Sequence, residues 1–78
     1  MGRKPKDQEE QVSNQIETLR LEIGMTRQEL ADAVGVHYQT VGYIERGEYS
    51  PSLVLAFRIS KALGQPIESI FTLEEEQE

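Results

Sequence analysis

Cysteine is absent from the 78-residue sequence, and histidine occurs only once, as His37. Disulfide bonds and thiolate metal sites are therefore excluded, and a lone histidine has no second one with which to share a metal ion. No apolar run approaches the ~20 residues of a membrane span, and no signal-peptide core follows the basic start. We expect a cytoplasmic protein without a metal or cofactor and without membrane contact. The sequence shows no nucleophile–base pair and no phosphate-binding loop, so we do not expect an enzyme.

Positive charge is also scarce, because 8 basic residues face 14 acidic ones and the net charge is -6. Residues 1–10 sum to zero, residues 74–78 carry -4, and the body between them carries -2. At physiological salt the Debye length is ~8 Å, so a tail lying away from a binding face repels a duplex only weakly. A body of -2 is still not a basic patch, and we expect modest nonspecific affinity for nucleic acid.

The spacing of apolar residues predicts one small all-α domain. Residues 1–10 are interpreted as a flexible arm, residues 11–73 as the folded domain, and residues 74–78 as an acidic tail. Val12, Ile16, Leu19 and Ile23 recur at helical intervals and place the first helix over residues 12–23. Four further helices are predicted over residues 27–34, 37–46, 51–63 and 67–71. Residues 71–73 alternate and can add a short strand.

Residues 26–52, TRQELADAVGVHYQTVGYIERGEYSPS, have the layout of two helices joined by a tight turn. Thr26 and Glu29 have the spacing of a capping box, and Gly35 ends the first helix. Val41 and Ile44 mark the inward face of the second. Its outward face carries residues that hydrogen-bond, stack or leave space: Tyr38, Gln39, Gly42, Tyr43 and Arg46. This layout is typical of proteins that place one helix in a DNA groove.

Four blocks of sequence resemble the Cro/cI-type (XRE-type) helix-turn-helix repressors, and most of all their short stand-alone members. In order, the blocks are LRLEIGMTRQELADAVGV, QTVGYIERGEYSPS, LAFRISKALG and IESIF, and together they cover about residues 16–71. The resemblance implies a compact five-helix, lambda-repressor-like domain. It also implies a transcriptional regulator, a repressor in this case, that binds palindromic double-stranded DNA as a homodimer with its third helix in the major groove.

Phosphate contacts are expected at both ends of the motif. The resemblance assigns one to Arg27 and another to His37, although His37 stands where the family commonly has a small hydroxyl cap. Arg46 is a further candidate because a guanidinium grips two phosphate oxygens at once. Tyr49 and Ser50 can add neutral donors. For each arginine, the alternative is an ordinary solubilising charge.

Base contacts are expected from the positions that the resemblance gives to Tyr38, Gln39 and Tyr43. Gln39 can pair with the N6 and N7 edge of adenine, which is worth ~1–3 kcal/mol of discrimination. The two tyrosines are about 140° apart around a helix, so only one can point straight into the groove. The alternative for Tyr43 is packing against a neighbouring helix. Gly42 would let the helix approach the bases closely.

Three other features of the sequence modify this picture. Arg20 and Glu45 match a pair that forms an internal salt bridge in several relatives, so we assign both to structure. Glu48 lies in a loop that often donates to phosphate, and here it would repel one. The N-terminal GRKPK resembles arms that enter the minor groove, with a solubilising terminus as the alternative.

Excess apolar residues in the last two helices indicate a second copy of the chain as a partner, because such area on a monomer favours aggregation. The dimer surface is expected to comprise Leu53, Val54, Phe57, Ile67, Ile70, Phe71 and Leu73. Two other functions remain open at this point. One is an antitoxin of the same fold that binds a toxin as well as operator DNA, and the other is a protein-interaction module without DNA binding.

Overall fold

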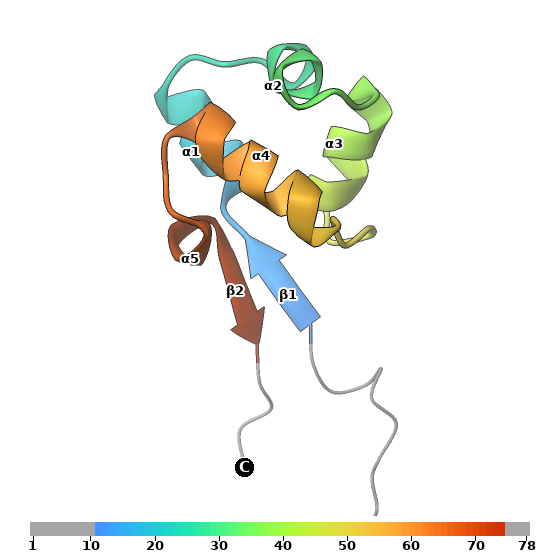
Figure 1. The fold of residues 1–78 in the computed structure, drawn as a ribbon, viewed down its shortest axis with the longest axis vertical. Coiled ribbons are helices and arrows are strands. Elements are labelled where there is room, and N and C mark those ends of the chain that lie inside the picture. The colour runs from blue at the N-terminus through green and yellow to red at the C-terminus, as the bar shows by residue number, and fades with distance from the viewer. Residues whose placement is uncertain (1–10, 75–78) are drawn as a thin grey trace, which may run out of the picture.

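The computed structural model describes residues 11–74, which form five helices and a two-stranded sheet (Figure 1). The elements in order are β1 (Gln11–Asn14), α1 (Ile16–Glu22), α2 (Arg27–Val34), α3 (Tyr38–Glu45), α4 (Leu53–Leu63), α5 (Ile67–Ile70) and β2 (Phe71–Glu74). The predicted five-helix domain is thus confirmed. None of these helices has the length and apolar character needed to cross a membrane. The predicted arm and, apart from Glu74, the predicted acidic tail lie outside the described residues.

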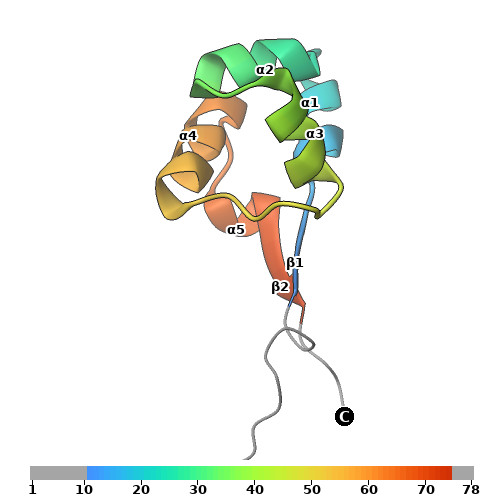
Figure 2. The same ribbon diagram turned by 90° about the vertical axis from the view of Figure 1, so that its right-hand side faces the viewer.

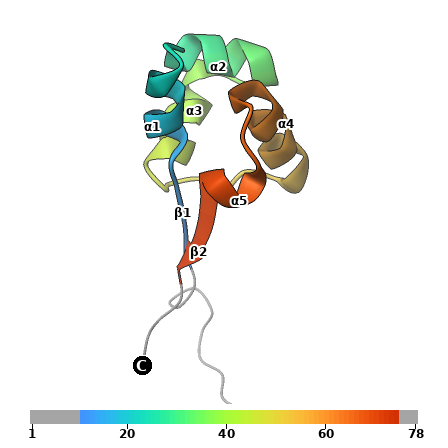
Figure 3. The ribbon, with the colours of Figure 1, turned by 90° about the vertical axis from the view of Figure 1, so that its left-hand side faces the viewer.

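One aliphatic core holds the helices together, and every helix contributes to it. Helix α4 lies opposite α1 and α3, while α2 runs across one end of the molecule (Figures 2 and 3). The sheet projects from the other end, beside α5. The core consists of Ile16, Leu30, Ala31, Val34, Val41, Ile44, Leu55, Ile59, Leu63 and Ile70. Because its residues recur at helical spacing, they fix which face of each helix remains outside.

The turn between α2 and α3 is set by local sequence. At the start of α2, the Thr26 hydroxyl accepts from the Glu29 amide at 3.0 Å, and the Glu29 carboxylate accepts from the Thr26 amide at 2.8 Å. At its end, Gly35 has a φ of 80°, a left-handed conformation that disfavours residues with a side chain. Only residues 35–37 separate the helices. The predicted capping box and glycine stop are therefore confirmed.

The N-terminal element differs from the prediction. Residues 11–14 form a strand that pairs antiparallel with β2, with Val12 opposite Leu73 and Asn14 opposite Phe71. The predicted helix start at Val12 is therefore wrong, and α1 begins at Ile16. Ile23 lies beyond the end of α1 and is 54% exposed. Spacing alone was misleading because Val12 also suits a strand, and its partner strand is almost 60 residues away along the chain. The predicted C-terminal strand is confirmed and extends to Glu74.

Asn14 connects the sheet to two helices. Its Nδ2 donates to the carbonyl oxygen of Ile44 in the last turn of α3 at 2.9 Å. Its Oδ1 accepts from the amide of Ile16, the first residue of α1, at 3.1 Å. Helix ends leave such carbonyls and amides without intrahelical partners. The Asn14 side chain therefore contacts both helix ends and ties β1 to α3, although the Ile44 carbonyl also accepts from the Gly47 amide at 3.0 Å.

Replacing Asn14 by alanine is expected to lower the free energy of unfolding by about 1–3 kcal/mol, because the buried Ile16 amide loses its acceptor and the Ile44 carbonyl keeps only the Gly47 amide as a donor. Urea unfolding followed by circular dichroism measures the change. Ser13→Ala is the matched control in the same strand. Equal stability of the two variants would contradict the role assigned to Asn14.

Candidate nucleic-acid interface

The exposed face of α3 forms a shallow depression of about 210 Å³. Five residues of α3 and its C-cap and one residue of α2 line it: Arg27, Tyr38, Gln39, Gly42, Tyr43 and Arg46. All six were predicted to contact DNA. Tyr38 and Tyr43 are 46% and 47% exposed, so neither is used in the core. The structure thus collects the predicted groove-facing residues on one surface.

Gly42 forms the floor of this depression. A methyl group added at Gly42 would lie 3.2 Å from Nη1 of Arg46 and 3.9 Å from Cδ of Arg27. Two arginine side chains therefore border the space above the glycine. Gly42 is buried for this reason, and not because it packs into the core.

A buried carboxylate lies directly beneath this face. Glu45 accepts from Nε of Arg20 at 2.8 Å, and the two side chains are only 4% and 6% exposed. Arg20 also donates through Nη2 to Glu45 at 3.3 Å and through Nη1 to the carbonyl of Met25 at 3.1 Å. The pair is bidentate and joins α1 to the end of α3, which is the internal salt bridge that the resemblance implied.

Arg27 shares the same carboxylate, which the sequence analysis did not foresee. Its Nε donates to Oε1 of Glu45 at 3.2 Å, and its side chain is 33% exposed. The negative charge of Glu45 raises the pKa of Arg27 above its usual value, so this guanidinium stays charged. Its carbon atom Cζ lies 5.9 Å from the centre of the Tyr38 ring. Glu45 and Tyr38 thus hold a cation at the start of α2.

Arg46, the other arginine beside Gly42, is also paired with a carboxylate. Its Nε lies 3.3 Å from Oε2 of Glu48, and its Cζ lies 5.2 Å from the centre of the Tyr43 ring. Both charged side chains are about half exposed. Tyr43 therefore stacks with an arginine at the surface. We expected Glu48 to repel a phosphate, but its charge is offset because its carboxylate pairs with Arg46.

His37 occupies the position before α3 without capping it. Its backbone is extended, with φ -70° and ψ 147°, and its side chain forms no capping hydrogen bond. A hydroxyl or carboxamide at this position would accept from an amide in the first turn. The exposed imidazole instead lies beside the first turn of α3.

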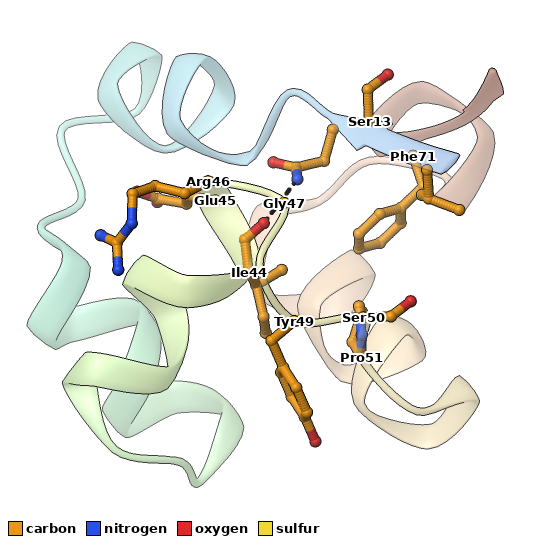
Figure 4. A pocket seen from close by; sticks show the side chains of 11 residues that line it. Ser13, Ile44, Glu45, Arg46, Gly47, Tyr49, Ser50, Pro51 and Phe71 are labelled. Atoms are coloured by element: carbon orange, nitrogen blue, oxygen red, sulfur yellow. Dashed lines mark hydrogen bonds between the residues drawn. The ribbon is translucent and has the colours of Figure 1, made fainter. Parts of the chain in front are cut away.

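A second cavity lies on the other side of α3, between β1 and the loop that leads to α4 (Figure 4). Its volume is about 530 Å³. Ile44 and Arg46 border it on one side, and Phe71 and Pro51 on the other. The dashed line at Ile44 marks the hydrogen bond that the Asn14 side chain donates to the Ile44 carbonyl, at the wall of this cavity. The predicted phosphate donors Tyr49 and Ser50 lie on this loop, next to the cavity and not in the depression at Gly42.

The predicted dimer residues differ in their exposure. Leu53, Val54 and Phe57 are exposed along α4, and Leu73 is exposed on β2. Ile67 and Phe71 are partly covered. Ile70 is fully buried in the core, so its inclusion in a dimer surface is wrong. Its position in a short last helix resembled that of an exposed residue because four residues give too little periodicity to define a face.

Two short helices joined by a three-residue turn, with a polar and aromatic outer face on the second, define a helix-turn-helix DNA-binding protein. The comparison with known families agrees, because the helix-turn-helix family HTH_3 matches residues 16–70. The chain belongs to this family. It is a DNA-binding transcriptional regulator and not an enzyme.

Curated relatives are of similar length. An uncharacterised HTH-type transcriptional regulator of Methanothermobacter thermautotrophicus is 55% identical over 58 residues, which are 73% of this chain and 84% of the relative. YgzD of Bacillus subtilis, also an uncharacterised HTH-type regulator, is 45% identical over 65 residues, or 83% of this chain and 98% of the relative.

Solved structures share the fold. The restriction-modification controller protein C.AhdI of Aeromonas hydrophila superposes with a TM-score of 0.67 and 29% identity, over 70% of this chain and 83% of that one. The transcriptional regulator VanUg superposes with a TM-score of 0.74 and 26% identity, over 96% of this chain and 100% of that one. These neighbours confirm the lambda-repressor-like architecture.

Proposed function

We propose that the protein is a homodimeric repressor that occupies an inverted-repeat operator with α3 of each protomer in the major groove. The observation that carries this proposal is the exposed face of α3, where hydrogen-bonding and stacking side chains surround a glycine floor. None of these side chains is needed for the core. The likeness to a restriction-modification controller and to transcriptional regulators supports a role in controlling transcription.

The geometry favours a division of labour across this face. Gln39 is exposed on α3, where its carboxamide can accept from and donate to the adenine edge. Arg27 lies at the first residue of α2, where free backbone amides also favour an anion, so it suits a phosphate. Its contact with Glu45 holds the guanidinium in place before DNA arrives. Tyr49 and Ser50 can donate to phosphates beyond the end of α3.

The exposed apolar stretch of α4 favours a dimer. Leu53, Val54 and Phe57 are 70%, 61% and 54% exposed, and such a cluster is costly to leave in water. Pairing these helices about a two-fold axis would leave α3 free on each protomer. Two such helices reach successive major grooves roughly 34 Å apart, which implies half-sites about one helical turn apart.

Selection from a pool of random duplexes tests the proposal. The protein should retain an inverted repeat with half-site centres about one turn apart, as its two-fold symmetry requires. Gln39→Ala should lose preference for one adenine in each half-site by ~1–3 kcal/mol and keep the other preferences. Glu17→Gln, at an exposed residue of α1, is the control. If no duplex is retained even at low salt, the protein is an interaction module instead, and co-purification of a toxin would favour the antitoxin.

A further inference from the structure

Arg46 lies at the middle of the exposed face of α3, although it is the residue that ends this helix. At 100° per residue the face from Tyr38 to Tyr43 spans about 140°, and Arg46 falls near its centre. Its side chain runs back along the helix, which places Nη1 only 3.2 Å from where a methyl group on Gly42 would lie. The guanidinium therefore occupies the space that the glycine leaves open.

Glu48 contacts one edge of the Arg46 guanidinium and leaves another edge free. Its two carboxylate oxygens lie 3.3 Å from Nε and 3.4 Å from Nη2 of Arg46. A guanidinium has five N–H donors, and Glu48 faces two of them, one on Nε and one on Nη2. Within residues 11–74 no hydrogen bond is formed by the other three, and two of these lie along the edge formed by Nη1 and Nη2. The ring of Tyr43, 5.2 Å from Cζ, limits rotation of the plane.

We propose that Arg46 reads a guanine, donating from Nη1 and Nη2 to O6 and N7 in the major groove, and that Glu48 is its positioning residue. The inference rests on the proposed function, because it names a base that the α3 face recognises. Guanine presents two neighbouring acceptors that match this edge of the guanidinium. The Arg46–Glu48 pair has no net charge, so it attracts a phosphate weakly, yet its remaining donors keep a fixed direction.

Replacing single guanines in the selected duplex by 7-deazaguanine tests the contact, because this base lacks N7 but still pairs with cytosine. One such replacement in each half-site should weaken binding by about 5-fold or more, the equivalent of ~1 kcal/mol. Inosine at the same position removes only the minor-groove amino group and should leave affinity unchanged. A selected half-site without guanine, or affinity indifferent to 7-deazaguanine everywhere, would overturn the inference while leaving the proposed function intact.

The salt dependence of the Arg46→Gln variant separates a base contact from a phosphate contact. For a base contact, the sensitivity to 7-deazaguanine disappears while the slope of log affinity against log salt is unchanged. Loss of one phosphate contact would instead reduce the slope by about 0.9 and weaken all duplexes alike. That second result would refute the assignment of Arg46 to guanine. Glu17→Gln, at an exposed residue of α1, should change neither quantity.

Glu48→Gln tests the positioning role, since it keeps the size of the side chain and removes its charge. Unrelated duplexes should bind more tightly because a negative charge near DNA is lost. The penalty for 7-deazaguanine should become smaller, because Arg46 is less well oriented. A simple surface charge would produce only the first change, so an undiminished penalty would contradict the role given to Glu48. If no duplex is retained by the parent protein, the proposed function fails first, and this inference falls with it.

Discussion

Replacing Glu45 by alanine is expected to lower the free energy of unfolding by about 3–5 kcal/mol, because it leaves the charge of Arg20 buried without a partner. Arg20 is 5% exposed, so water cannot replace the lost carboxylate. Arg27 also loses a partner, but its side chain is one-third exposed and can be hydrated. The destabilisation therefore comes mainly from the stranded Arg20.

Thermal unfolding measures this effect. For a domain of this size, each kcal/mol shifts the melting temperature by about 4–8 °C, so a fall of more than about 12 °C is expected. Glu48→Ala is the matched control, because it removes a carboxylate from an ion pair that is half exposed. Exposed pairs contribute about 0–1 kcal/mol. If Glu45→Ala melts within a few degrees of Glu48→Ala, the assignment of Glu45 to structure is wrong.

Local signals explain why the helix-turn-helix unit could be predicted from sequence. The Thr26–Glu29 box and Gly35 act through neighbouring backbone groups, so their effect depends on few residues. The core positions of α2 and α3 follow helical spacing and are buried as expected. The grouping of Tyr38 with Arg46 on one face follows from the same periodicity.

Contacts between distant residues explain what could not be predicted. The strand pairing of Val12 with Leu73 has no local signature, and the helical spacing of Val12 competed with it. The contact of Arg27 with Glu45 depends on how α2 packs against α3. The pairing of Arg46 with Glu48 is local, but it depends on the rotamers of two exposed side chains. From residue type alone, we expected Arg46 to contact a phosphate and Glu48 to repel one.

The scarcity of positive charge in the sequence extends to the α3 face, where the arginines are neutralised by carboxylates. Both arginines on the α3 face are paired with carboxylates, Arg27 with Glu45 and Arg46 with Glu48. Pairing reduces the net attraction for any duplex and fixes the direction of the remaining donors. We therefore expect the selectivity of the proposed operator binding to come from the fit to base edges, because nonspecific affinity depends on unpaired cations near phosphate.

Replacing Phe57 by glutamate is expected to dissociate the proposed dimer without unfolding the protomer. Phe57 is 54% exposed on α4 and takes no part in the core, so the variant should keep the melting behaviour of a folded domain. Across a two-fold axis the new carboxylate would face its own copy in an apolar contact, where like charges repel. Analytical ultracentrifugation should show a monomer at concentrations at which we expect the parent protein to form the proposed dimer.

Dissociation of the proposed dimer by Phe57→Glu should also weaken DNA binding. Affinity for the inverted repeat is expected to fall by about 10²–10⁴-fold, because the second half-site is no longer reached at high effective concentration. Affinity for an isolated half-site should stay unchanged, since Phe57 lies outside the α3 face. Leu21→Glu is the matched control, because Leu21 is a similarly exposed apolar residue, 60% exposed on α1. If Leu21→Glu dissociates the dimer and Phe57→Glu does not, the two-fold axis passes near α1, and α4 is not the dimer surface.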